Sequence, residues 1–405
     1  MRIRFGSART AAAWVLVASF ALMAIAGCGA AGTPTSNADN FGWVSQGNDY
    51  APPGEGGFNV RWSKQLTDRW EARYLPVELS SAEFDTKRER VYIGTTEGNF
   101  FAFEMNGRRL FFYDAHAQIE SKAGVDADTG EVFFGSVDGT VHALSVTGEL
   151  KWKAKLIGSI RAQPVLAAGA LYVVTDTDTV TALARDDGRV LWTYDKEPVE
   201  EITIAGHAGM LLEDGRLYAA FTDGAVAALN PADGSLYWEL ETALDVELRP
   251  GNVPQFLDVD TTPVVRQGTL YVASFTAGLY ALNASSGSVE WRDADFKGVT
   301  GLASVGRMLI ITSAPRGVSL LDLRTREIQW EKAPERGAPT PPVVTETGTV
   351  IYGETQGSLL ALSLSDGHEI ARAEGGSGFS ATPAAAGAFG GAISNGGRFL
   401  CLRIN

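Results

Sequence analysis

Residues 216–240 read RLYAAFTDGAVAALNPADGSLYWEL, and this stretch decides the fold. Apolar residues alternate within three short runs, and turns containing Asp-Gly separate these runs. This pattern is typical of β-strands joined in hairpins. The same phrase recurs at 131–154, 170–194 and 269–293, and no segment of comparable length has helical periodicity. The sequence therefore predicts an all-β protein built from repeats.

An Ala-Leu pair, with small variations, ends the second run of each unit and measures the repeat. The spacings between successive marks are 41, 39, 46, 53, 39, 41 and 40 residues. A period near 40 residues, with three visible strands and room for a fourth, is typical of propeller blades. Eight marks predict eight blades: Ala102, Ala143, Ala182, Ala228, Ala281, Leu320, Ala361 and Cys401.

An aromatic residue that closes each unit gives a second measure of the repeat. It occurs at Phe111, Trp152, Trp192, Trp238, Trp291 and Trp330, and in degraded form at Ala371. The chain ends at Asn405 before an eighth can occur, so we expect FNVRWSKQL (58–66) to supply the missing outer strand, with Trp62 as its aromatic. Such closure leaves the ring without a free sheet edge. We predict an eight-bladed β-propeller of four-stranded blades over residues 58–405, its last blade closed by the N-terminal strand.

The N-terminus has the features of a secretion signal. Three arginines precede an uncharged stretch from Ala11 to Ile25, which is too short for a membrane span of about 20 residues. The stretch leads into Ile25-Ala26-Gly27-Cys28, which resembles the bacterial lipobox. We expect residues 1–27 to be a lipoprotein signal peptide, Cys28 to carry the lipid and 28–57, rich in Gly, Pro, Ser and Asn, to be a flexible tether. An ordinary signal peptide with a chance cysteine is the alternative.

Charge and cysteine content exclude several function classes. Removing the signal segment takes away three arginines and no acidic residue, so the formal charge of −14 becomes −17. An acidic surface disfavours nucleic acid and anionic lipid, so we expect membrane contact through the lipid anchor alone. Cys401 is left as a single thiol at a small-residue position of the repeat, which predicts a core residue rather than a reactive one.

The stretch FLDVDTTPVV (256–265) carries Asp258 and Asp260 two residues apart. This spacing occurs in a class of phosphatases, but there a helix follows the acidic strand, whereas here Pro263 leads into another strand. Two aspartates and two threonines do not complete the six to eight oxygens that calcium needs. A structural role at the entry of a blade and an acidic docking group remain as alternatives.

Two consecutive intervals of the repeat, 46 and 53 residues, are enlarged. The extra residues fall in 196–210 and 241–260, and neighbouring blades place these two insertions side by side on one face. Long loops on a repeated scaffold carry function more often than the scaffold does. The first insertion contains Ile202 and Ile204, and the second ends at Asp258 and Asp260. Apolar side chains rimmed by carboxylates favour docking of a complementary basic partner.

The unit of Ala-Leu, a Gly turn and Trp at a 40-residue period resembles the PQQ-type propeller repeat. Together with the lipobox, the tether, eight blades and the Asp258–Val265 segment, the chain resembles the BamB family of barrel-assembly lipoproteins. That resemblance implies docking to POTRA domains of a BamA-like partner through the Asp-Val-Asp segment and a neighbouring loop, here Ile202–Gly206. In this chain, Ala205 stands at the loop position where the family has an arginine. It also implies an outer-membrane location facing the periplasm, and nascent outer-membrane proteins as further partners.

An enzyme is the least favoured reading. Quinone-dependent dehydrogenases usually have a pair of adjacent cysteines, which this chain lacks, and its four histidines are scattered without metal-ligand spacing. We therefore expect no cofactor and no metal, and predict a non-catalytic scaffold. A lipoprotein scaffold of another periplasmic complex is the first alternative, and a quinone-dependent dehydrogenase is the second.

Overall fold

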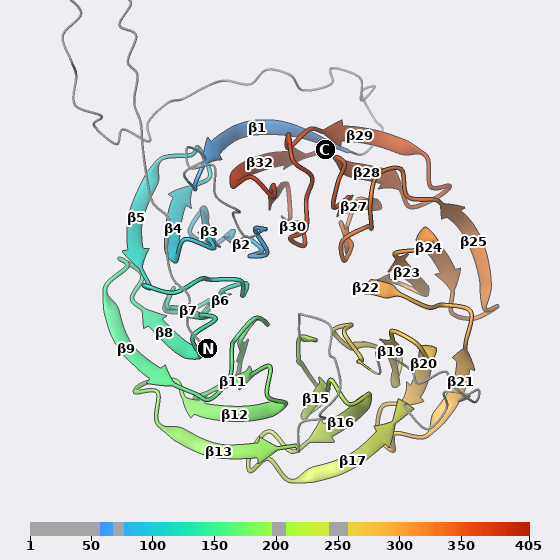
Figure 1. The fold of residues 1–405 in the computed structure, drawn as a ribbon, viewed down its shortest axis with the longest axis horizontal. Helices are drawn as coiled ribbons and strands as arrows, with labels where there is room; N and C mark the ends of the chain where they lie inside the picture. Colours follow the sequence, from blue (N-terminus) through green and yellow to red (C-terminus); the bar gives the residue numbers. More distant parts are fainter. Residues whose placement is uncertain (1–56, 68–76, 197–207, 243–257) are drawn as a thin grey trace, which may run out of the picture. The chain divides into compact units, whose positions relative to one another are not determined.

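The computed structural model describes residues 57–67, 77–196, 208–242 and 258–405. The chain divides into residues 1–39 and a compact unit, 40–405, which contains everything described. Eight four-stranded antiparallel sheets follow one another around a ring, with the first strand of each sheet innermost and the fourth outermost (Figure 1). The predicted eight-bladed β-propeller is confirmed.

The blades are numbered here in chain order. Blade 1 contains β2 (Glu83–Asp85), β3 (Arg90–Gly94), β4 (Asn99–Glu104) and β5 (Arg109–Asp114), and blade 2 contains β6 (Gly124–Val125), β7 (Val132–Gly135), β8 (Thr140–Leu144) and β9 (Leu150–Lys155). Blade 3 contains β10 (Val165–Leu166), β11 (Ala170–Val174), β12 (Thr179–Ala184) and β13 (Val190–Asp195), and blade 4 contains β14 (Leu211–Glu213), β15 (Arg216–Ala220), β16 (Ala225–Leu229) and β17 (Leu236–Glu241). Blade 5 contains β18 (Val264–Arg266), β19 (Thr269–Ser274), β20 (Gly278–Asn283) and β21 (Val289–Asp293). Blade 6 contains β22 (Val299–Val305), β23 (Met308–Ser313), β24 (Gly317–Asp322) and β25 (Glu327–Lys332), and blade 7 contains β26 (Val343–Val344), β27 (Thr349–Gly353), β28 (Leu359–Ser363) and β29 (Glu369–Ala373).

Blade 8 joins the two ends of the ring. It contains β30 (Ala384–Ala386), β31 (Phe389–Ile393) and β32 (Arg398–Ile404) from the C-terminus, and β1 (Phe58–Gln65) from the N-terminus as its outermost strand. β1 runs antiparallel to β32, from Phe58 opposite Ile404 to Gln65 opposite Arg398 (Figure 1). The predicted closure is confirmed.

The alanine of the Ala-Leu pair and the aromatic that closes each unit lie opposite each other on neighbouring strands. In blade 4, Ala228 lies opposite Trp238, and the remaining blades repeat this pairing at the predicted positions. A small side chain on the third strand makes room for the ring on the fourth. Most of these Trp rings then cover a glycine of the next blade: a Cβ at Gly234 would lie 2.6 Å from the ring of Trp192, and its φ of +74° suits glycine. In blade 6 the residue in this place is Arg326, whose guanidinium lies 5.4 Å from the centre of the Trp291 ring. The Ala, Gly and Trp of the repeat are thus one packing unit shared by two blades.

The alternation of strand direction gives the ring two faces. The turns joining first to second and third to fourth strands lie at one face, which we call the turn face. The turns joining second to third strands, and the connections between blades, lie at the other, which we call the insertion face because both enlarged connections belong to it. Within the described residues no helix is long and apolar enough to cross a bilayer.

Candidate docking face

The predicted site residues fall partly within the described ranges. Asp258 is 1% exposed, whereas Asp260 is partly exposed. Ile202 and Ile204 lie outside the described residues, as does Ala205 between blades 3 and 4. Cys28 also lies outside them. Of the two aspartates, Asp260 is therefore the one whose side chain reaches the surface.

The backbone of the Asp-Val-Asp segment bridges two blades. The Val259 amide donates to the Phe221 carbonyl of blade 4 at 3.3 Å, and the Phe275 amide of blade 5 donates to the Asp258 carbonyl at 2.9 Å. The Val259 side chain is 1% exposed and packs in the hydrophobic cluster of these blades. Burial of a valine between two charged residues explains why the segment is held in one place on the insertion face.

Thr261 makes a structural contact that recurs in other blades of the ring. Its hydroxyl accepts the Ala273 amide at 2.8 Å and donates to the Ala273 carbonyl at 3.3 Å, which ties the blade entry to the second strand. The same tie occurs in three other blades, between Ser80 and Gly94, Ser121 and Gly135, and Thr340 and Gly353. The Asp-x-Asp-Thr pattern thus combines a recurring hydroxyl with two acidic residues.

The ends of both insertions gather around one turn of blade 4. At the first insertion, Lys196 forms an ion pair of 2.9 Å with Asp223. At the second, the Thr242 hydroxyl donates to the Gly224 carbonyl at 2.8 Å. Val259 closes the second insertion on the same turn through Phe221. The two insertions also meet directly, because the Gly209 amide donates to the Thr262 hydroxyl at 3.0 Å.

Carboxylates recur at the blade entries of the insertion face. Glu78, at the entry to blade 1, accepts the Thr96 amide at 3.0 Å and the Thr96 hydroxyl at 2.8 Å. The pKa of Glu78 is raised from 4.5 to about 7, chiefly by burial and to a smaller extent by the nearby Glu97 and Glu120, against the lowering effect of the two hydrogen bonds from Thr96. Glu120 in turn forms an ion pair with Arg161 of the next blade. Asp260 precedes the recurring hydroxyl of Thr261 by one residue, as Glu120 precedes that of Ser121, whereas Glu78 precedes Ser80 by two.

The structure adds one residue that sequence reasoning did not single out. Ile157, in the connection between β9 and β10 on the insertion face, is 83% exposed. Its turn is held from blade 3, where Asp176 accepts the Ser159 amide at 2.6 Å and the Thr177 hydroxyl donates to the Ile157 carbonyl at 3.4 Å. The sequence around it, Leu156-Ile157-Gly158-Ser159-Ile160, carries no signal of this exposure, because apolar residues flank Ile157 and the connection has the ordinary length of the repeat.

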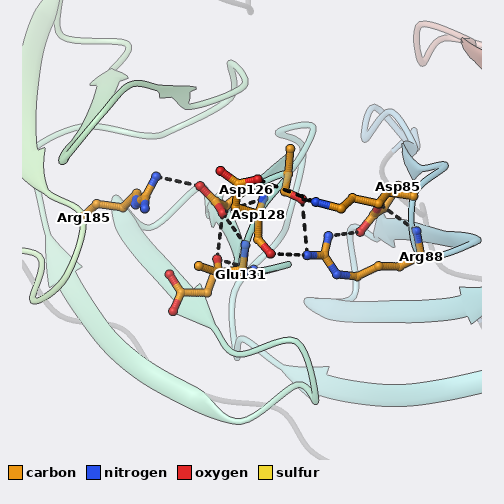
Figure 2. Close-up of polar contacts among 9 residues, drawn as sticks. Asp85, Arg88, Asp126, Asp128, Glu131 and Arg185 are labelled. Carbon is orange, nitrogen blue, oxygen red and sulfur yellow. Dashed lines mark hydrogen bonds and ion pairs between the residues drawn. The ribbon is translucent and has the colours of Figure 1, made fainter.

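On the turn face, ion pairs and hydrogen bonds join the turns of blades 1, 2 and 3. Figure 2 shows Arg88 reaching from blade 1, where it pairs with Asp85 at 2.9 Å, to the Asp128 carbonyl of blade 2 at 2.6 Å. Arg185 of blade 3 pairs with Asp126 of blade 2 at 2.6 Å from the other side. These partners are protein groups, so the network joins blades.

The structure also shows the surroundings of Cys401 and of the side chains that could hold a metal ion. Cys401 is buried on β32 opposite Trp62, as expected for a core residue, and burial raises the pKa of its thiol to about 12. In the described part of the chain, no three His, Cys, Asp or Glu side chains gather in a way that would hold a metal ion.

Comparison with known proteins bears on the fold and the family. The model of the family described as outer membrane protein assembly factor BamB matches residues 59–332. A protein of that name from Bordetella pertussis is 24% identical over 367 residues, covering 89% of each chain. The crystal structure of BamB from Moraxella catarrhalis superposes with a TM-score of 0.71 at 21% identity, covering 86% of this chain and 100% of that one. A quinohemoprotein alcohol dehydrogenase from Pseudomonas putida shares the fold at a TM-score of 0.63 and 12% identity, covering 85% of this chain and 76% of that one.

Proposed function

Since the chain belongs to the family of the outer membrane protein assembly factor BamB, we propose that it is a non-catalytic scaffold of β-barrel assembly. It is held by a lipid on Cys28 at the outer membrane, faces the periplasm and docks POTRA domains of a BamA-like partner. Docking uses the insertion face, through Ile202 and Ile204 of the first insertion and the Asp258–Asp260 segment of the second. Nascent barrel proteins are further partners.

One observation carries this proposal: the ends of both enlarged connections converge on the Phe221–Ala225 turn and contact each other through Gly209 and Thr262. Blade 4 holds the described ends of both insertions at one location, and on this proposal the first insertion presents its paired isoleucines beside the aspartates of the second. Asp260 is accessible there, while Asp258 and Val259 hold the segment in place. An apolar patch with an acidic rim is complementary to a partner with basic residues around an apolar centre.

The proposal is tested by purifying the lipidated protein from membranes and identifying the proteins that co-elute. We expect Ile202→Ser with Ile204→Ser, or Asp260→Ala, to reduce recovery of a POTRA-containing partner. Asp186→Ala is the matched control, because Asp186 is an exposed aspartate on the turn face. If all variants recover the partner as the parent does, docking through the insertion face is wrong.

A further inference from the structure

A cavity of about 560 Å³ opens between blades 6 and 7 on the turn face. Met308 and Leu320 of blade 6, with Leu364 and Ile370 of blade 7, give it an apolar wall. The side chains of Ser365 and His368 lie at its edge among other polar groups. An apolar hollow with polar groups at one side suits an aromatic ring that carries a hydroxyl.

The corresponding interface between blades 4 and 5 is filled by a tyrosine of the chain itself. The Tyr218 hydroxyl donates to the Ala284 carbonyl at 3.1 Å, and the Trp238 indole donates to the same carbonyl at 3.1 Å. The interface one blade earlier is built identically, with donors and acceptor Tyr172, Trp192 and Pro231. Blades 1 and 5 also carry a tyrosine at this strand position, Tyr92 and Tyr271, whereas blades 2, 7 and 8 have Phe133, Ile351 and Gly391 there. Four of the eight blades therefore place a phenol at this position.

Blade 6 keeps the tryptophan of this arrangement but not the tyrosine. The Trp330 indole donates to the Leu364 carbonyl at 2.9 Å, as in the other blades. The strand position of Tyr218 is occupied by Ile310, which pairs with Leu320. Two aliphatic side chains fill the inner part of the interface and leave the part near the turns open, where Met308 and Leu364 line the cavity.

The N-terminal segment joins the ring beside this cavity. Gly57 lies against blade 7, where a Cβ on it would be 3.8 Å from Cγ1 of Ile370 and 3.5 Å from Cβ of Ala371. Ile370 is itself part of the cavity wall. The Gly57 carbonyl accepts the Asn405 amide at 3.0 Å, which fixes the point of entry.

Residues 1–57 contain one tyrosine, Tyr50, seven residues before Gly57. Seven residues reach at most about 25 Å when extended, so Tyr50 can fold back to a cavity whose wall Gly57 already touches. The intervening AlaProProGlyGluGly supplies the Pro and Gly residues that reverse chain direction.

We propose that Tyr50 occupies this cavity, with its ring against Leu320, Leu364 and Ile370 and its hydroxyl toward Ser365 and His368. The tether thus supplies to blade 6 the phenol that blades 3 and 4 carry on their own second strands.

Disulfide trapping in the full chain tests the proposal while leaving Tyr50 intact. With Cys28→Ser, the buried Cys401 is the remaining native thiol. Ala51→Cys is combined with Ser365→Cys at the cavity edge. In the control it is combined with Ser285→Cys, the matching exposed turn position of blade 5, whose interface Tyr218 already fills. We expect severalfold more cross-linking with Ser365→Cys than with Ser285→Cys.

Two further variants separate docking of the ring from mere proximity of the tether. Adding Tyr50→Ala should lower cross-linking to the control value, whereas Tyr50→Phe should retain most of it. Rebuilding the blade 4 pair with Ile310→Tyr and Leu320→Ala should also abolish the excess, with folding checked by circular dichroism. Equal cross-linking at Ser365→Cys and Ser285→Cys, or an excess that survives Tyr50→Ala, overturns the proposal and leaves the cavity to another occupant.

Discussion

The two aspartates of the docking segment should separate under mutation into one that maintains the fold and one that binds. Asp258 is 1% exposed, and its carbonyl is tied to blade 5 through the Phe275 amide. A carboxylate so deeply buried must be hydrogen-bonded, and Asp258→Ala leaves its buried donors unpaired. We expect a loss of about 2 kcal/mol in the free energy of unfolding, within the range of about 1–3 kcal/mol for such groups.

Asp260→Ala should leave stability nearly unchanged, within about 0.5 kcal/mol, because the side chain is partly exposed. Its effect should be on partner binding, where loss of one acidic group at the rim weakens affinity about fivefold, or about 1 kcal/mol. Calorimetric unfolding measures the first effect, and titration of a purified POTRA-containing partner measures the second. Asp186→Ala on the turn face controls for the change in net charge.

The reasoning fails if Asp258→Ala unfolds at the parent temperature, since the carboxylate would then contribute nothing to the blade entry. It fails equally if Asp260→Ala lowers the unfolding temperature as much as Asp258→Ala does. A partner that binds Asp260→Ala with unchanged affinity would remove this residue from the docking surface, leaving the insertions themselves to be tested.

Three other predictions concern the ring. Glu78 has its pKa raised from 4.5 to about 7, so the native state favours the protonated form; its stabilising contribution is complete below pH 4.5 and is lost as the pH rises through 7. The shift corresponds to about 3 kcal/mol, and Glu78→Gln should flatten the fall in stability between pH 5 and 8 measured by denaturant unfolding; an unchanged slope contradicts this. Trp62→Ala should lower the free energy of unfolding by about 3–5 kcal/mol, because it removes a ring packed on Phe103 and a hydrogen bond to the Met105 carbonyl. Trp62→Phe should lower it less, and equal unfolding temperatures for the two variants would contradict the packing argument. In a Cys28→Ser chain, Cys401 should react with a thiol reagent only on unfolding, and fast labelling of the folded protein would show that its burial is wrong.

Repetition made the fold readable from the sequence. The same small residue and the same aromatic return about every 40 residues because each blade must solve the same packing problem against its neighbour. Their pairing across adjacent strands, as in Ala228 with Trp238, shows that the two spacings measured one contact. The closing strand followed from counting, since seven closing positions, six aromatic and one Ala371, against eight Ala-Leu marks left one outer strand to be found, and Trp62 opposite Cys401 supplies it.

The site was less readable because a linear pattern does not give exposure. Asp258 and Asp260 look equivalent in the sequence, yet Val259 between them must be buried, and the backbone hydrogen bonds to blades 4 and 5 take Asp258 inside with it. Spacing did show which connections are enlarged. It did not show that Lys196, Thr242 and Val259 all attach to one turn of blade 4, because those contacts join residues far apart in the chain.

Departures from the repeat differ in how they can be detected. An insertion changes a spacing, so the two enlarged connections can be found by counting. A substitution within the period changes no spacing: Ile310 for tyrosine is an apolar residue in a strand, and Leu320 for alanine compensates for it in the inner core. Only when the Trp330–Leu364 contact is set beside those of Trp192 and Trp238 does the missing phenol become visible. Four of the eight blades carry a tyrosine at this strand position, so the repeat itself offers a phenol as one occupant of the open interface, and Tyr50 at the adjoining end of the chain has that chemistry.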